Sequence, residues 1–149
     1  MEKTHGAYLL STDRDKLDVE VIHQFLSTAS YWAQHIPRDV VVRSIKGSLC
    51  FGIYHEGSQV GFARVITDNA TFGYLADVFV LPAHRGRGLS KWMMECILAH
   101  PDLQGMRRFM LATRDAHTLY AQFGFEALGN PERLMQILRA VPYPPRPDN

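Results

Sequence analysis

A glycine-rich loop is the part of the sequence best suited to bind a charged ligand. Between an expected strand and an expected helix the chain reads Val80-Leu81-Pro82-Ala83-His84-Arg85-Gly86-Arg87-Gly88-Leu89-Ser90. The first N–H groups of a helix have no intrahelical partner, and the helix dipole adds partial positive charge there. Glycines let the backbone approach an anion closely, and the two arginines could pair with phosphate. The loop is predicted to hold a pyrophosphate, with an ordinary strand-to-helix turn as the alternative.

Two common phosphate-binding loops do not fit this segment. No Gly-Lys-Ser/Thr sequence is present, which excludes a nucleotide-hydrolase P-loop. Gly86 and Gly88 are followed by Lys91, where a dinucleotide-binding fold needs a third glycine.

A second motif lies further along the chain and reads Leu119-Tyr120-Ala121-Gln122-Phe123-Gly124-Phe125. Together the two segments resemble the GNAT superfamily of acyl-CoA-dependent N-acetyltransferases, over about residues 5–128. The family's loop is Arg/Gln-x-x-Gly-x-Gly/Ala, matched by Arg85, Gly88 and Ser90, with Ser in place of the usual Gly or Ala. Its later helix carries Leu-Tyr-x-x-x-Gly-Phe, which the second motif matches. Thr113 stands where many members have Asn.

The resemblance implies a cofactor, acetyl-CoA, and a set of residues that bind it. The pyrophosphate would lie on the loop amides, and the pantetheine arm would pair with the backbone of Val78 and Val80 like an added strand. A backbone N–H near Val78 or Phe79 would stabilise the oxyanion. The full set of expected cofactor-binding residues is Val78, Phe79, Val80, Arg85, Gly86, Arg87, Gly88, Leu89, Ser90, Thr113 and Phe123.

The resemblance also implies the reaction. The amine of a small molecule or a peptide would attack the thioester carbonyl directly, and Tyr120 would donate a proton to the departing thiolate. A phenol with a reference pKa near 10 keeps its proton at neutral pH, so it can act as an acid. The alternatives are that Tyr120 is an amphipathic core residue, and that the whole protein is a non-catalytic acyl-CoA-binding module.

Asp77 is a carboxylate inside the otherwise apolar run YLADVFVL. A charge in such a strand is costly unless it is paired, so it is expected to be either a general base or a structural carboxylate. Strict alternation would place Asp77 on the same face as Leu75 and Phe79, although a bulge near Val78 would re-aim it.

Tyr31 and Trp32 lie in a polar and aromatic connection between two expected helices. Aromatic rings can bind a cationic amine, so the pair is predicted to contact the acceptor. The alternative is a hydrophobic plug at the end of a helix.

The pattern of apolar residues predicts an α/β (α+β layered) fold with a mixed, mostly antiparallel central sheet flanked by helices. Expected strands span 7–12, 49–54, 60–66, 72–81, 108–112 and 125–128, and 134–138 is ambiguous. Expected helices span 16–29, capped by Asp13 or Asp15, then 37–46, 89–97 and 115–123, the last closed by Gly124. The 72–81 and 108–112 strands are predicted to be parallel. One domain is expected over 1–149, with a core of 5–128 and an extension of 129–149.

Composition excludes several classes of protein. The formal charge of +1 over 149 residues argues against a nucleic-acid partner. Two cysteines cannot build a disulfide framework or a four-thiolate zinc site, and no metal is expected. No apolar run approaches the roughly 20 residues of a membrane span, and the N-terminal residues do not form a secretory signal, so a cytoplasmic protein without a membrane partner is expected. A homodimer through residues 134–138 is a further expectation.

Overall fold

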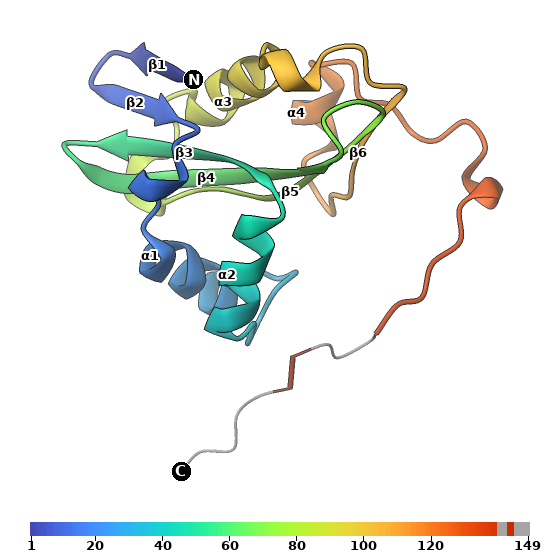
Figure 1. Ribbon diagram of the computed structural model, residues 1–149, viewed down its shortest axis with the longest axis horizontal. Coiled ribbons are helices and arrows are strands. Elements are labelled where there is room, and N and C mark those ends of the chain that lie inside the picture. The colour runs from blue at the N-terminus through green and yellow to red at the C-terminus, as the bar shows by residue number, and fades with distance from the viewer. Residues whose placement is uncertain (140–142, 145–149) are drawn as a thin grey trace.

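One mixed sheet organises the molecule. In the computed structural model, which describes residues 1–139 and 143–144, six strands follow the order β1-β2-β3-β4-β5-β6 (Figure 1). Neighbouring strands are antiparallel except for β5 and β6, which are parallel. The predicted fold class and the parallel pair are therefore confirmed. The strands are β1 (Glu2–His5), β2 (Tyr8–Ser11), β3 (Leu49–His55), β4 (Ser58–Thr67), β5 (Phe72–Val80) and β6 (Arg108–Leu111).

The N-terminal edge of the sheet is a hairpin of two strands, whereas the sequence predicts only the second of them, at 7–12. β1 and β2 pair from Glu2↔Ser11 to His5↔Tyr8, and Gly6 in the turn has a φ of +57°. β1 carries the sequence EKTH and is exposed along its whole length. Because it buries no side chain, it lacks the apolar alternation by which a strand is found in a sequence.

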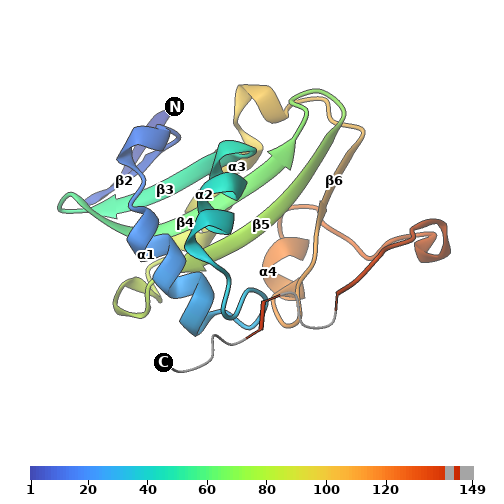
Figure 2. The ribbon, with the colours of Figure 1, turned by 60° about the horizontal axis from the view of Figure 1, so that its bottom comes forward.

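Helices cover both faces of the sheet (Figure 2). On one face lie α1 (Val19–Gln24), the π-helical turn Phe25–Ala29 and α2 (Arg38–Lys46), with a core that includes the fully buried Ile22 and Phe62. On the other lie α3 (Leu89–Leu98) and α4 (His117–Ala121), with a larger core that includes Phe51 and Met93. No helix among the described residues is long and apolar enough to cross a membrane.

The first helix begins later than predicted. α1 starts at Val19, and its N-cap is Asp18, whose carboxylate accepts hydrogen bonds from Glu20 N at 3.1 Å and Val21 N at 3.2 Å. Asp13 instead caps a short 3-10 turn, Arg14–Lys16. The predicted caps, Asp13 and Asp15, were wrong because the intervening turn separates them from α1.

The predicted strand at 125–128 was also wrong. The described chain forms no strand there or at 134–138. Phe125 packs its ring against Phe109 and Tyr120, with centroids 5.4 and 6.0 Å away. Its amide bonds to Tyr120 O at the end of α4, so side-chain burial and not sheet pairing explains the apolar character of this stretch. α4 ends at Ala121, two residues before the predicted end, and Gly124 lies in the turn that follows, with a φ of +91°.

Replacing Asp18 by Ala should lower the free energy of unfolding by about 1 kcal/mol, because two amides of α1 lose their acceptor. The matched variant Asp15→Ala removes a carboxylate that caps no helix and should change stability by less than about 0.5 kcal/mol. Urea denaturation followed by circular dichroism measures both. Equal losses for the two variants would contradict the assignment of the cap.

Candidate functional site

β5 extends beyond its partner on one side. β5 and β6 pair only from Phe72↔Arg108 to Leu75↔Leu111, whereas β5 continues to Val80. Within the described chain, the edge of β5 on the β6 side is therefore unpaired over residues 76–80. This edge is available to an extended ligand, and it includes the predicted pantetheine-binding residues Val78 and Val80.

A bulge at Asp77 produces this arrangement. The register between β4 and β5 shifts between Phe62 and Arg64, and Asp77 has a φ of +56°. Leu75 packs in the core beneath α3, whereas Phe79 packs in the core beneath α1 and α2. Leu75 and Phe79 thus lie on opposite faces, which corrects the strict alternation and confirms the expected bulge.

The Asp77 carboxylate is held by two donors. Arg64 Nε donates to Oδ2 at 2.6 Å, and Trp32 Nε1 donates to Oδ1 at 2.8 Å. The Arg64 and Asp77 side chains are only 15% and 9% exposed, and Arg64 also donates to Ser48 Oγ at 3.1 Å. These contacts favour the structural role that the sequence left open for Asp77.

Residues 30–36, here called the strap, run from the π-helical turn to α2 and carry Tyr31 and Trp32. Tyr31 reaches the loop that follows β6, where its hydroxyl accepts a hydrogen bond from Arg114 N at 3.1 Å. The Arg114 guanidinium lies 3.9 Å from the centre of the Tyr31 ring. Tyr31 and Trp32 remain 44% and 40% exposed, so the strap presents aromatic surface to solvent. Through Trp32 it contacts Asp77 on β5, and through Tyr31 it contacts the loop that follows β6.

Tyr120 lies on α4, close to this strap. Burial, and to a smaller degree the neighbouring Tyr31, raises the pKa of Tyr120 above its ordinary value of 10. The hydroxyl therefore keeps its proton throughout the neutral range. It forms no hydrogen bond with any other described residue, so it is free to donate to a ligand.

The glycine loop presents unpartnered amides. Gly86 and Gly88 have φ values of +74° and +75°, and α3 begins directly after them. The first helical hydrogen bond runs from Trp92 N to Gly88 O at 3.0 Å, so the amides of Leu89 and Ser90 have no helical acceptor.

The space around this loop fits a pyrophosphate. A Cβ placed on Gly86 or Gly88 would meet nothing within 4 Å, and residues 85–88 are exposed. Arg87 is in no salt bridge among the described residues, whereas Arg85 Nε donates to Val80 O at 2.9 Å. A row of free amides beside an unpaired cation has the donor chemistry that a phosphate needs.

Several partners in the site were missed at the sequence level. Tyr8 OH and His84 Nδ1 lie 2.9 Å apart and join β2 to the start of the glycine loop. No sequence pattern around either residue indicates a contact between positions so far apart in the chain. The pairing of Arg64 could have been anticipated, because an arginine in an apolar strand is itself a sign of a buried acidic partner.

Two predicted cofactor-binding side chains also have roles within the fold. Thr113 Oγ1 accepts a hydrogen bond from Ala116 N at 3.0 Å, at the start of α4. Phe123 is half-buried against the larger core. Their contacts to a cofactor remain predictions.

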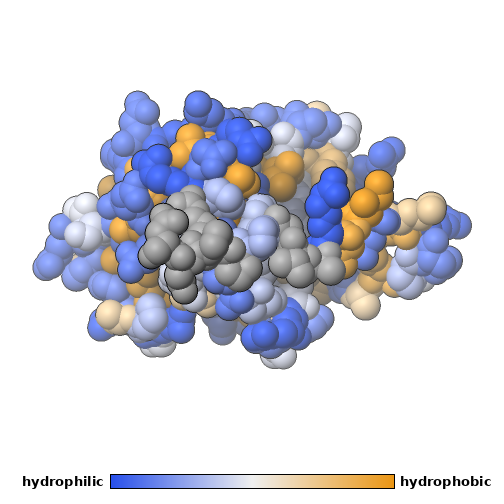
Figure 3. Space-filling model, turned by 90° about the horizontal axis from the view of Figure 1, so that it is seen from below, coloured by the Kyte–Doolittle hydropathy of each residue, from blue (hydrophilic) through white to orange (hydrophobic). Residues whose placement is uncertain are grey.

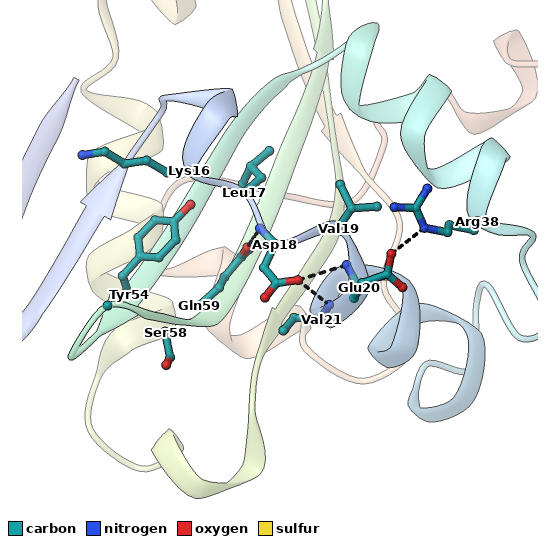
Figure 4. A pocket seen from close by; sticks show the side chains of 11 residues that line it. Lys16, Leu17, Asp18, Val19, Glu20, Val21, Arg38, Tyr54, Ser58 and Gln59 are labelled. Carbon is teal, nitrogen blue, oxygen red and sulfur yellow. Dashed lines mark hydrogen bonds and ion pairs between the residues drawn. The ribbon is translucent and has the colours of Figure 1, made fainter.

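A hollow of about 590 Å³ lies elsewhere, at the start of α1 and the β3–β4 turn (Figure 4). Its acidic groups are already engaged, because Asp18 caps α1 and Glu20 pairs with Arg38. None of the predicted site residues lines it. The lining residues are Lys16, Leu17, Asp18, Val19, Glu20, Val21, Arg38, Tyr54, Gly57, Ser58 and Gln59.

Comparison with known proteins accounts for this geometry. Residues 46–127, which include the bulge, the glycine loop and α4, match the acetyltransferase (GNAT) domain. The chain belongs to the GNAT family of acetyltransferases. The match spans more than half of the chain and confirms the resemblance found in the two motifs.

Individual relatives agree with this membership. A Gibberella zeae protein named for an inferred acetyltransferase activity is 38% identical over 141 residues, covering 80% of this chain and 78% of its own. A crystal structure from Xanthomonas campestris pv. campestris, described as a GNAT-family acetyltransferase, is 54% identical with a TM-score of 0.90, covering 91% of this chain and 96% of its own. Glucosamine-6-phosphate N-acetyltransferase from Arabidopsis thaliana shares the fold, with a TM-score of 0.60 at 17% identity, covering 89% of this chain and 97% of its own.

Replacing Asp77 by Ala should lower the free energy of unfolding of this GNAT protein by about 3 kcal/mol, because the largely buried Arg64 cation loses its partner. Asp77→Asn should cost clearly less, since Asn keeps an acceptor oxygen and tolerates a positive φ. Urea denaturation of both variants measures the difference. Losses below about 0.5 kcal/mol for both would show that the pair does not hold the bulge.

Proposed function

We propose that this GNAT protein is an N-acetyltransferase that moves the acetyl group of acetyl-CoA to a primary amine of a small molecule or a peptide. One observation supports this most directly. The unpartnered amides of the glycine loop, the open edge of β5 and the free hydroxyl of Tyr120 share the face of the molecule formed by α3 and α4. A ligand with a diphosphate at one end and a thioester at the other matches that order of groups.

Binding is proposed to use the main chain first. The amides of Gly86, Gly88, Leu89 and Ser90 would donate hydrogen bonds to the oxygens of the diphosphate, and Arg87 would add positive charge. The open edge of β5 at Val78 and Val80 would pair with the amide groups of the pantetheine arm. Because these contacts are mostly backbone, they depend on glycine conformation and strand divergence more than on particular side chains.

The chemistry is proposed to rest on orientation and on one acid. Acetyl-CoA supplies an acetyl thioester that a neutral amine can attack. A backbone N–H at Val78 or Phe79, beside the bulge, would donate to the carbonyl oxygen as negative charge develops on it. Tyr120 would give its proton to the departing sulfur, which its raised pKa allows because the hydroxyl is protonated at neutral pH. Holding the amine and the carbonyl side by side can lower the barrier by about 7–11 kcal/mol.

The acceptor is proposed to enter over the strap. Tyr31 and Trp32 offer exposed aromatic surface beside the β5–β6 divergence, which suits a cationic amine. Trp32 is fixed by its bond to Asp77, so this surface is ordered before any ligand arrives.

The activity is tested by incubating the protein with acetyl-CoA and a broad panel of primary amines. The panel includes small polyamines, amino sugars and peptide N-termini. A thiol reagent detects released CoA, and calorimetry measures acetyl-CoA binding separately. We expect binding without an amine and CoA release with at least one class of amine. Binding without release across the whole panel would instead support an acyl-CoA-binding module, and absence of binding would overturn the proposal.

Replacing Tyr120 by Phe should lower kcat about 100-fold at neutral pH, because the leaving thiolate loses its proton donor. Affinity for acetyl-CoA should be unchanged, since the hydroxyl is not proposed to bind the diphosphate. The matched control is Tyr74→Phe, a half-buried tyrosine in the paired part of β5, which should keep full activity. Equal kcat values for Tyr120→Phe and the wild type would exclude the acid role.

A further inference from the structure

Three aromatic side chains meet at the point where the glycine loop begins. They are Tyr8 on β2, His55 at the end of β3 and His84 at the end of the 3-10 turn Pro82–His84, and they are here called the ring cluster. Each ring lies close to the other two, since the centroids are 4.8 Å apart for Tyr8 and His55, 5.7 Å for Tyr8 and His84, and 5.2 Å for the two histidines. The cluster therefore joins two strands of the sheet to the turn that precedes the loop.

A hydrogen bond fixes two members of this cluster together. The Tyr8 hydroxyl and His84 Nδ1 lie 2.9 Å apart, and in either tautomer of the imidazole one of these atoms can donate to the other. Among the described residues, the Tyr8 hydroxyl has no second hydrogen-bond partner. Tyr8 is only 8% exposed, so separating it from His84 would leave a largely buried hydroxyl unsatisfied.

The glycine loop has few other contacts that could fix its position. Residues 85–88 are exposed, so burial does not hold them. The rim of the molecule is largely hydrophilic when it is seen from the α1 and α2 side (Figure 3), and a turn at such a rim must be held by hydrogen bonds. Within the described chain, the other hydrogen bonds made by residues 82–88 reach no further than five residues along the sequence. The bond to Tyr8 spans 76 residues and ties this stretch to a different strand.

The same hairpin also contacts the first turn of α3. The ring of His5 on β1 stacks on the ring of Trp92, with centroids 5.2 Å apart and planes at 30°. Trp92 N donates the first helical hydrogen bond of α3, to Gly88 O. The β1–β2 hairpin thus touches the chain on both sides of the glycine loop, at His84 before it and at Trp92 after it.

We propose that the β1–β2 hairpin positions the glycine loop for acetyl-CoA, and that Tyr8 and His84 are the positioning residues. This inference rests on the proposed function, in which the loop binds the diphosphate. A loop that is ordered in advance loses less conformational freedom on binding, so the contact raises affinity without touching the ligand. The ring cluster forms no hydrogen bond with Tyr120 or Asp77 among the described residues, so its effect falls on binding and not on the transfer step.

Calorimetry with CoA measures this effect directly. Tyr8→Phe removes only the hydroxyl, and we expect the Kd for CoA to rise about 5-fold, as for the loss of one hydrogen bond. The matched control is Tyr54→Phe on the neighbouring strand β3, because Tyr54 is 7% exposed and its hydroxyl has no hydrogen-bond partner among the described residues. This control should bind CoA like the wild type. Equal Kd values for Tyr8→Phe and the wild type would overturn the inference, whereas a wild type that binds no CoA would overturn the proposed function on which it rests.

Variants of His84 test whether the two residues act as a pair. His84→Ala should weaken CoA binding at least as much as Tyr8→Phe does. The double variant should be no weaker than His84→Ala alone, because both changes remove the same bond. His84→Asn should bind nearly as well as the wild type, since its side-chain amide can replace Nδ1 as the partner of Tyr8. Additive losses would show that His84 acts independently of Tyr8 and would overturn the inference.

A donor without the diphosphate separates positioning of the loop from a general loss of structure. S-Acetylpantetheine carries the thioester and the pantetheine arm but has no diphosphate, and it is compared with acetyl-CoA using an amine that the wild type acetylates. Tyr8→Phe should lower kcat/KM for acetyl-CoA about 5-fold through KM, with kcat unchanged. The kcat/KM for S-acetylpantetheine should stay at the wild-type value. An equal loss with both donors would indicate a general structural defect and would overturn the inference.

Discussion

The ion pair between Arg64 and Asp77 is the contact on which the site depends. It joins β4 to a bulge in β5, at a residue whose φ of +56° is uncommon outside glycine, although Asp and Asn adopt it more readily than other residues do. A backbone in that conformation persists only when its surroundings hold it, and here two donors hold the carboxylate from either side. The bulge turns β5 so that its last residues lose their partner on β6 and present an open edge.

The same carboxylate also positions the other half of the site. Because Trp32 donates to Asp77, the strap is tied to the centre of the sheet, and Tyr31 is carried across to Arg114. A single buried acidic group therefore sets both the strand edge and the aromatic surface beside it. The glycine loop is positioned separately, by α3. The helix is fixed on the sheet by its buried residues, which are Leu89, Trp92, Met93, Met94, Cys96 and Ile97. Because α3 is packed on the sheet, the amides at its start are held in place even though the loop before it contains two glycines.

Most strands of the sheet and the two motifs could be recognised in the sequence because both are local patterns. Alternation reveals β3, β4 and β5, and glycines reveal turns and helix ends, since each depends on neighbours along the chain. β1 escaped prediction because it is exposed throughout, and the cap at Asp18 was misplaced because several acidic residues compete in that stretch. The partners of Asp77 could not be read from the sequence, as Trp32 is 45 residues distant and meets it only through the fold.

The contacts of the site also bear on the two proton transfers that the proposed acyl transfer would require. Tyr120 is buried and has a raised pKa, and its hydroxyl makes no hydrogen bond within the described chain, so it meets the requirements of the proposed acid. Asp77 is the opposite case, because both of its oxygens already accept from donors that the fold needs. If Asp77 took a proton from the amine, both of those bonds would weaken, because a neutral carboxyl group is a poorer acceptor than a carboxylate. The rings of Tyr31 and Trp32 are exposed to solvent, so in the proposed reaction the amine would lose its proton to water instead.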